Sequence, residues 1–157
     1  MKIGHGYDVH RFGAENKPLM LGCTEIPHSV GLIAHSDGDV VCHALCDALL
    51  GAAGTRDIGY YFPDTDNAYS GASGAYLLGK TVEIIHGLGY AFSCADITVV
   101  AEKPRLSPHI GDMRANIAAA LGADASCVNV KATTEEGLGI AGSGIACHAV
   151  CLLEKEK

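Results

Sequence analysis

Three side chains in the first third of the sequence have the types and the spacing of an open metal site. Asp8 and His10 are two residues apart, so in an extended strand over residues 4–12 both point to the same side of the sheet. His43 lies in the first turns of an expected helix and is the third candidate ligand. Two imidazoles and one carboxylate suit a catalytic zinc that keeps one coordination position for substrate. The same donors suit ferrous iron, so ligand type alone leaves the reaction open.

Other polar clusters fall where loops are expected. His35–Ser36 comes just before Asp39, the expected N-cap of the helix that carries His43. A loop there can wrap an anion with hydroxyl, imidazole and helix-end N–H donors, although ordinary turn chemistry explains it equally well. Residues 57–59 and 62–66 place carboxylates in a polar loop that can bind hydroxyls or simply face water.

A further pair of clusters follows two expected strands. Lys103 and Arg105 flank Pro104 in a stiffened turn, where cations suit a phosphate or a base edge. Residues 131–136 end another strand with hydroxyls and carboxylates. Threonine can donate to phosphoryl oxygens, and glutamate can hold Mg²⁺ or Mn²⁺. Neither cluster identifies a reaction alone.

Two glycine patterns imitate nucleotide-binding motifs. Gly74–Thr81 matches a P-loop, but that mechanism needs a buried strand before the loop, and residues 64–73 cannot form one. We expect an amphipathic helix there, with Lys80 on the solvent side. Gly137–Gly142 matches GxGxxG, but a strand rather than a helix is expected to follow it. That segment is predicted to be a glycine-rich turn.

Length and composition limit the protein class. A chain of 157 residues with 48% apolar content predicts one domain with a substantial core. The net charge of −7 and the lack of a basic cluster argue against a nucleic-acid partner, and no apolar run is long enough for a membrane span. With no signal-peptide pattern at its start, the protein is expected to be cytoplasmic, or stromal in a plastid-bearing organism.

The cysteines are predicted to stay reduced. Their number, seven, is odd, and no export signal accompanies them. Most are expected to be small buried residues. A second, structural zinc site that uses Cys42 and Cys46, or Cys147 and Cys151, is a weaker alternative because no CxxC pair occurs.

The elements that must position these residues alternate between strand and helix. Strands are expected at 3–10, 95–101, 128–132 and 144–153, with short strands over 18–26 that turn near Gly22. Helices are expected at 39–54, at 72–88 with Leu77, Ile84, Ile85 and Leu88 inward, and from Ser107–Pro108 to Gly122, with a loop at 60–70. This order predicts an α/β or α+β fold: a single domain, 1–157, with one mixed sheet of about four main strands and helices on one face.

Together these motifs resemble one family, the 2-C-methyl-D-erythritol 2,4-cyclodiphosphate synthases of the non-mevalonate isoprenoid pathway. The likeness covers essentially the whole chain. It rests on Gly4–His10, Ala34–Asp39, Asp57–Gly59, Phe62–Asp66, Pro108–Ile110 and Asn129–Thr134.

The resemblance implies a reaction and its ions. The 2-phosphate of a cytidine-diphosphate-linked methylerythritol 2-phosphate attacks its own β-phosphorus, which closes a cyclic diphosphate and releases CMP. Zn²⁺ would be held by Asp8, His10 and His43, and Mg²⁺ or Mn²⁺ by Glu136. His35 and Thr134 would stabilise the transition state.

The resemblance also assigns a homotrimer around a central axis, with each active site shared between neighbouring subunits. The residues it assigns to substrate binding are Asp8, Val9, His10, His35, Ser36, Asp57, Ile58, Gly59, Phe62, Pro63, Asp64, Thr65, Asp66, Ala101, Glu102, Lys103, Pro104, Arg105, Leu106, Ser107, Ala132, Thr133, Thr134, Glu135, Glu136 and Ile140.

The chain departs from the family pattern in its glycine-rich turn. Ile140 and Ser143 stand where an aromatic residue and an arginine are usual, so an anion site on the trimer axis is in doubt. Arg105 replaces a common lysine, which keeps the charge and changes the donor geometry. The rival hypotheses are a ferrous oxygenase with the same triad, a P-loop nucleotide-binding protein and a non-catalytic metal-binding protein.

Overall fold

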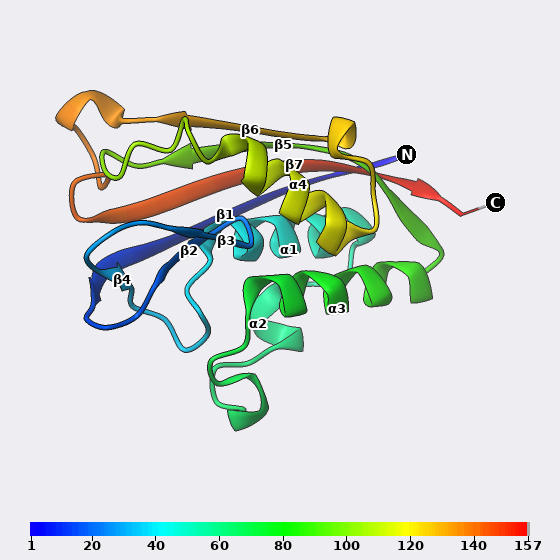
Figure 1. The fold of residues 1–157 in the computed structure, drawn as a ribbon. Helices are drawn as coiled ribbons and strands as arrows, with labels where there is room; N and C mark the ends of the chain where they lie inside the picture. Colours follow the sequence, from blue (N-terminus) through cyan, green and yellow to red (C-terminus); the bar gives the residue numbers. More distant parts are fainter. Residues whose placement is uncertain (157) are drawn as a thin grey trace.

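The core of the fold is a five-stranded mixed sheet, which a computed structural model describes within residues 1–156. Its long strands are β1 (Lys2–Ala14), β5 (Tyr90–Val100), β6 (Val128–Thr133) and β7 (Gly144–Lys155), and its fifth strand is the short β4 (Gly31–Leu32). The strand order is β4-β1-β7-β5-β6, with β5 and β6 parallel and the other neighbours antiparallel (Figure 1). The expected mixed sheet in an α+β fold is confirmed.

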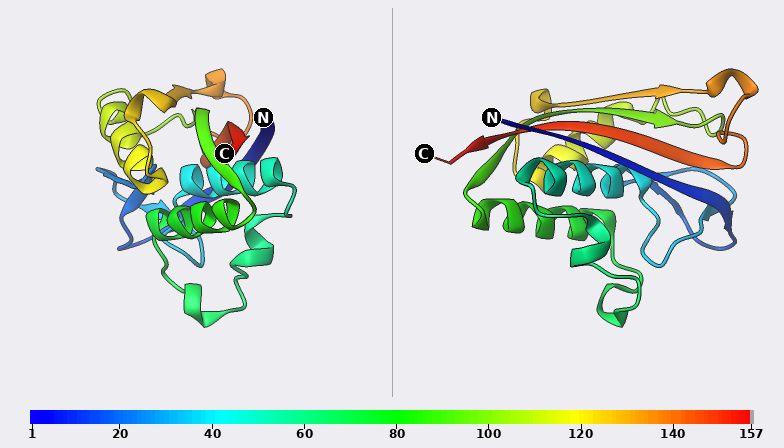
Figure 2. Two further views of the ribbon diagram at one scale, coloured as in Figure 1. Left: turned by 90° about the vertical axis from the view of Figure 1, so that its right-hand side faces the viewer. Right: turned by 180° about the vertical axis from the view of Figure 1, so that it is seen from behind.

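Three helices cover one face of this sheet. They are α1 (Val40–Ala53), α3 (Gly74–Gly87) and α4 (Ile110–Leu121), and all lie on the same side of the strands (Figure 2). The opposite face of β1 carries exposed Ile3, Tyr7 and Val9, as the alternation of the sequence predicts. No helix among the described residues is long and apolar enough to cross a membrane.

Shorter elements connect the main ones. The hairpin of β2 (Leu19–Leu21) and β3 (Thr24–Ile26) turns at Gly22, as expected. The one-turn helix α2 (Ile58–Tyr61) follows α1. Three short 3₁₀ helices are η1 (Asn67–Tyr69), η2 (Ala125–Cys127) and η3 (Glu135–Gly137).

Two glycines set the position of β1 on α1. A Cβ at Gly6 would lie 1.9 Å from the carbonyl oxygen of Ala44, and one at Gly4 would lie 1.9 Å from that of Ala48. The strand therefore rests directly on the helix backbone. Each step of two residues forward along β1 corresponds to a step of four residues back along α1. Continuing this register by one step places Asp8 beside the first turns of α1, where His43 lies.

The N-terminus of α1 is capped as predicted. The carboxylate of Asp39 accepts hydrogen bonds from the backbone N–H groups of Val41 and Cys42, both at 3.1 Å. At the other end, Gly54 adopts φ +79°, a left-handed conformation that suits glycine and ends the helix. These two caps fix the helix that carries His43.

Three sequence predictions are wrong in detail. Helix α4 begins at Ile110 rather than at Ser107–Pro108: residues 107–109 form a turn, and the Ser107 hydroxyl accepts a hydrogen bond from Nε of Arg105. Leu88 is 48% exposed rather than inward, since it follows the end of α3. The expected loop over residues 60–70 contains the end of α2 and η1.

Both glycine motifs have the structures expected of them. Gly74–Thr81 forms the first turns of α3, and Lys80 on its surface pairs with Glu83 at 2.7 Å. This geometry is not a P-loop. Gly137 ends η3, and the rest of the motif leads through turns into β7, so a strand and not a helix follows it.

Candidate active site

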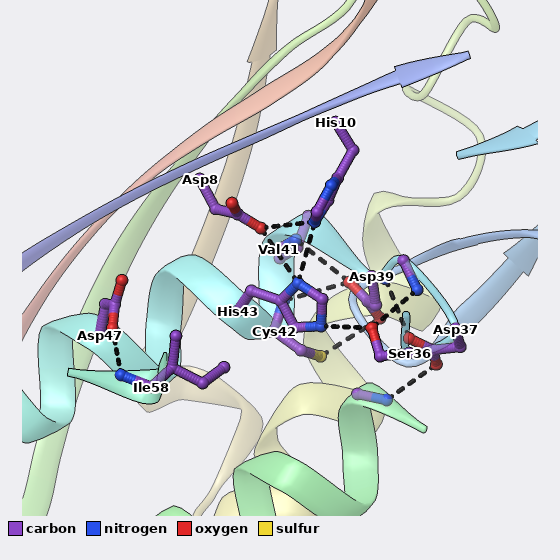
Figure 3. Close-up of polar contacts among 12 residues, drawn as sticks. Asp8, His10, Ser36, Asp37, Asp39, Val41, Cys42, His43, Asp47 and Ile58 are labelled. Carbon is purple, nitrogen blue, oxygen red and sulfur yellow. Dashed lines mark hydrogen bonds and ion pairs between the residues drawn. The ribbon is translucent and has the colours of Figure 1, made fainter. Parts of the chain in front are cut away.

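The three predicted metal ligands converge between β1 and α1. Oδ2 of Asp8 lies 3.0 Å from Nε2 of His10 and 3.0 Å from Nδ1 of His43, and the two ring nitrogens are 3.2 Å apart (Figure 3). The three donor atoms therefore face one common point. A carboxylate and two imidazole nitrogens arranged in this way fit a divalent transition metal.

A serine orients the buried ring of His43. Oγ of Ser36 lies 3.0 Å from Nε2 of His43, on the other side of the ring from Asp8 (Figure 3). When Nε2 carries the proton, it donates to Ser36 and leaves the lone pair of Nδ1 free for a metal. Metal-binding histidines usually have such a partner on the second nitrogen.

The charge states of the cluster suit a cation. Burial raises the pKa of Asp8, but hydrogen bonds and charge interactions with His10 and His43 outweigh it, so the net pKa lies below the ordinary value. Burial lowers the pKa of His43, but the hydrogen bond and charge of Asp8, followed by the charges of Asp39 and Asp37, raise it overall. The Asp8 carboxylate is thus anionic, and the raised pKa of His43 reflects the favourable position that this carboxylate gives to a positive charge.

A cavity of about 410 Å³ opens beside the triad. It is lined by Asp8, His10, Ile33, Ala34, His35, Ser36, His43, Ile58, Gly59, Phe62, Asp64, Tyr69 and Leu77. The cavity therefore brings the predicted metal ligands together with parts of three predicted substrate loops. Ile33, Ala34, Tyr69 and Leu77 were not predicted to be site residues, although Leu77 was expected to face inward.

His35 has a buried ring nitrogen without a hydrogen-bond partner in the described part of the chain. Its Nε2 is buried and makes no hydrogen bond to any described residue. A buried polar atom of this kind is costly unless a ligand or water satisfies it. Because His35 lines the cavity, this nitrogen suits an anionic or hydroxylic ligand.

A lysine that the sequence did not single out supports this loop. Nζ of Lys17 donates to the backbone oxygens of Ser36, at 2.5 Å, and Ala34, at 3.3 Å. Lys17 therefore holds both sides of His35 from the segment that follows β1. A lone lysine before a proline gives no sequence signal for this contact.

The loop around α2 is fixed by carboxylates. Oδ1 of Asp47 accepts from the backbone N–H of Ile58 at 2.7 Å, and Asp57 caps α2 through the N–H of Tyr60 (Figure 3). Asp66 caps η1 in the same way. Asp57 and Asp66 thus have structural contacts of their own, and neither lines the cavity, nor do Pro63 and Thr65.

The remaining predicted site residues gather elsewhere in the chain. They are Ala101, Glu102, Lys103, Pro104, Arg105, Leu106, Ser107, Ala132, Thr133, Thr134, Glu135, Glu136 and Ile140, at the ends of β5 and β6 and in the turn before β7. In Figure 1 this turn is the orange loop at the upper left, whereas α2 lies at the bottom. None of these residues lines the triad cavity.

This second group is itself well organised. The carboxylate of Glu135 accepts from the N–H groups of Ile140 and Ala141, both at 2.9 Å. The hydroxyl of Thr134 donates to Glu136 at 3.0 Å and accepts from its backbone N–H. Ile140 lines a second cavity of about 560 Å³, together with Val9, which points away from α1, and with His10.

The cysteines add a cluster that spacing did not predict. Cys23 and Cys42 lie beside Asp39, with the donor atoms of all three residues within 4.8 Å of one another. Cys42, Cys46, Cys147 and Cys151 are buried, as expected for most of the cysteines. The structure thus pairs Cys42 with Cys23 rather than with Cys46.

The chain resembles known proteins over nearly its full length. Residues 1–154 match the model of the YgbB family. A curated relative from Thioalkalivibrio sulfidiphilus, 2-C-methyl-D-erythritol 2,4-cyclodiphosphate synthase, is 56% identical over 98% of this chain and 97% of its own. The relative of that name from Escherichia coli is 55% identical over 99% of this chain and 98% of its own.

Solved structures show the same likeness. The bifunctional IspDF from Campylobacter jejuni superimposes with a TM-score of 0.93 at 43% identity. The match covers 98% of this chain and 42% of that chain. A 2C-methyl-D-erythritol-2,4-cyclodiphosphate synthase in its CDP-bound form gives a TM-score of 0.90 at 35% identity, covering 98% of this chain and 100% of that chain.

Proposed function

Because this chain belongs to the YgbB family of 2-C-methyl-D-erythritol 2,4-cyclodiphosphate synthases, lyases of the non-mevalonate isoprenoid pathway, we propose that it closes the cyclic diphosphate beside Asp8, His10 and His43. Residues 1–157 would act as one synthase domain. The substrate would be 4-diphosphocytidyl-2-C-methyl-D-erythritol 2-phosphate, and the products the cyclodiphosphate and CMP. The named relatives favour this lyase over an oxygenase with the same triad.

The observation that carries the proposal is that three metal-type donors share one cavity with His35, whose buried Nε2 has no partner among the described residues. Ring closure needs two anionic phosphoryl groups to approach in line. The nucleophile is already an anionic phosphate oxygen, so no activated serine or cysteine is required. The work of the protein is therefore positioning and charge compensation.

In this proposal Asp8, His10 and His43 hold Zn²⁺, and Glu136 holds Mg²⁺ or Mn²⁺. When bound, these cations polarise the phosphoryl oxygens and offset the charge of the diphosphate. Ser36 keeps the ring of His43 in its ligating orientation. The protein has a net charge of −7, so its overall charge repels an anionic substrate, and such local cations would supply the attraction for the diphosphate.

The cavity residues then orient the methylerythritol phosphate. Nε2 of His35 donates a hydrogen bond to phosphoryl oxygen, which holds the 2-phosphate toward the β-phosphorus. The backbone of Ile58–Gly59 and the carboxylate of Asp64 contact the hydroxyls. A new P–O bond forms at the β-phosphorus, the bond to the α-phosphate oxygen breaks, and CMP leaves with that electron pair. Phe62 and Leu77 help to exclude water, which would otherwise hydrolyse the diphosphate.

We further propose that a neighbouring copy completes the site in a homotrimer. The Ala101–Ser107 turn and Thr133–Glu136 lie outside the triad cavity of their own chain, as described above. Docked against the triad of a second copy, they would hold the cytidine diphosphate, with Thr134 donating to phosphoryl oxygen. The solved relative described above as a CDP-bound form supports this ligand class.

The test is product identification by ³¹P NMR. Purified protein with Zn²⁺ and Mg²⁺ is mixed with the cytidylylated 2-phosphate substrate. We expect the substrate signals to be replaced by those of CMP and one cyclic diphosphate, and His35→Ala to slow this conversion by about 100-fold or more. An open-chain diphosphate with CMP, or oxygen consumption with a 2-oxo acid, would contradict the proposal.

A further inference from the structure

Cys23 and Cys42 form a close thiol pair outside the triad cavity. Their sulfur atoms are 3.3 Å apart, although 18 residues separate them in the sequence and the two lie on different elements. Cys42 is in the first turn of α1, and Cys23 is in the turn between β2 and β3. A disulfide needs the sulfurs to come to about 2.05 Å, so the two atoms must approach one another by ~1.2 Å.

Asp39 locks both thiols in this arrangement. Its Oδ1 accepts from the N–H of Gly22 at 2.8 Å, and its Oδ2 accepts from the N–H of Cys23 at 2.6 Å. The same carboxylate caps α1 and accepts the S–H of Cys42 at 3.2 Å. One buried side chain thus fastens the hairpin turn to the helix start, and the thiols cannot drift apart without breaking these bonds.

The backbone at Cys23 is unusual for a cysteine. Gly22 and Cys23 form a two-residue hairpin turn, and both have φ of +59°. Glycine and asparagine are the residues that favour such a turn, and other side chains are strained there. In this strained backbone conformation the Cys23 side chain contacts Cys42 of α1.

We propose that Cys23 and Cys42 are a thiol pair that hydrogen peroxide converts to an intramolecular disulfide. Cys23 is half-buried and therefore reacts first: its sulfur attacks one peroxide oxygen, the O–O bond breaks, and a sulfenic acid and one water form. The sulfur of Cys42 then attacks the sulfenic sulfur, the S–O bond breaks, and the Cys42 proton joins the leaving hydroxyl as a second water. Two thiols lose two hydrogens, and the peroxide is reduced to two waters.

A metal site is the competing use of this cluster. Two thiolates and a carboxylate would suit zinc, but the oxygens of Asp39 already accept from four backbone N–H groups and one thiol. A carboxylate used in this way has little capacity left for a cation. With two remaining sulfur ligands the set is incomplete for tetrahedral zinc, so the disulfide is favoured.

The disulfide would close a loop that contains Ser36, Asp39 and the β4 strand. A covalent closure of this length restricts the unfolded chain and stabilises the fold. It would also tie the hairpin turn to the residue immediately before His43. The link between the hairpin turn and α1 would therefore form on oxidation, and a dithiol reductant would break it.

The experiment is peptide mapping of the full chain after mild treatment with hydrogen peroxide. We expect one cross-linked peptide that joins Cys23 to Cys42, loss of two of the seven thiols, and a melting temperature about 5 °C higher that dithiothreitol reverses. Cys23→Gly suits the left-handed turn and should fold normally, but it should show none of these changes. Cys127→Ser, at another half-buried cysteine, should retain all of them.

Three results would overturn the proposal. The first is a sulfinic acid at Cys23 with Cys42 still a thiol. The second is a disulfide of either residue with another cysteine or another chain. The third is a zinc ion, detected by native mass spectrometry, that is lost on Cys23→Gly while the triad zinc remains, which would make the cluster a metal site.

Discussion

The hydroxyl of Ser36 lies 3.0 Å from Nε2 of His43, on the side of the ring opposite Asp8. This contact joins the loop that carries His35 to the helix that carries the proposed metal ligand. When Nε2 carries the proton and donates it to Ser36, the lone pair of Nδ1 is left as the donor for a metal. The loop that carries His35 and the proposed metal site are therefore one structural unit.

Removing this hydroxyl should weaken metal binding. In Ser36→Ala the imidazole of His43 loses its orienting partner, and we expect zinc affinity to fall about 10-fold. Competition with a chromophoric chelator at constant pH measures the change. Ser29→Ala, at an exposed serine before β4, should bind zinc like the parent chain. Equal affinities in the two variants would show that Ser36 does not orient the ligand.

The close contact of β1 and α1 predicts a strong effect of Gly6→Ala. The added Cβ would lie 1.9 Å from the carbonyl oxygen of Ala44, which cannot move without displacing the helix. We expect a loss of about 1–3 kcal/mol or more in the free energy of unfolding, measured with urea. Gly79→Ala in α3 has nothing within 4 Å and should instead gain up to about 1 kcal/mol. A Gly6→Ala chain as stable as the parent would contradict the packing described.

The pKa of Asp47 predicts a pH-dependent stability difference. Burial raises this pKa, and the hydrogen bond from the N–H of Ile58 only partly opposes the shift. A raised folded-state pKa means that ionisation costs stability, so this cost is present at neutral pH and disappears as pH falls below the ordinary value of about 3.9. Asp47→Asn removes the charge and keeps an acceptor oxygen for Ile58.

The variant should accordingly be more stable than the parent chain at pH 7, and the difference should shrink toward zero as the pH is lowered below about 4. Urea unfolding in the presence of a chelator at several pH values measures this difference. A gap that grows with falling pH would have the wrong sign for a carboxyl whose pKa is raised.

A site shared between copies predicts complementation. His43→Ala removes the triad half of the site, and Thr134→Ala removes the half at the end of β6, so each variant alone should be inactive. In oligomers assembled from an equal mixture, about a quarter of the shared sites would contain two intact halves. We expect CMP release at about that fraction of the parent rate. No recovery in demonstrably mixed oligomers would place both halves in one chain.

The sequence was sufficient for features that depend on neighbouring residues. Asp8 and His10 share a strand face because side chains alternate, and Asp39 caps α1 because its carboxylate reaches the next N–H groups. The start of α4 was misplaced because Ser107 and Pro108 have the local pattern of a helix start, whereas in the structure the Ser107 hydroxyl accepts from Nε of Arg105 and the helix begins at Ile110. Local signals fail where a side chain has two possible partners.

Contacts between distant segments could not be predicted from the sequence. Nothing in the spacing of Lys17 and Ser36, or of Cys23 and Cys42, indicates that these pairs meet, since each meeting depends on how a loop docks on α1. The division of the predicted site is another example. Residues 101–107 and 132–136 have suitable chemistry, but the chain fold places them away from the triad cavity.

The central claim is that Asp8, His10 and His43 hold the zinc ion at which the diphosphate reacts. Anomalous diffraction at the zinc edge, from crystals grown with CDP and Zn²⁺, tests it most directly. We predict one strong peak per chain among Oδ2 of Asp8, Nε2 of His10 and Nδ1 of His43, with a diphosphate oxygen of CDP as a further ligand. A zinc peak elsewhere, or no peak at the triad in crystals of enzyme that turns over normally, would contradict the claim.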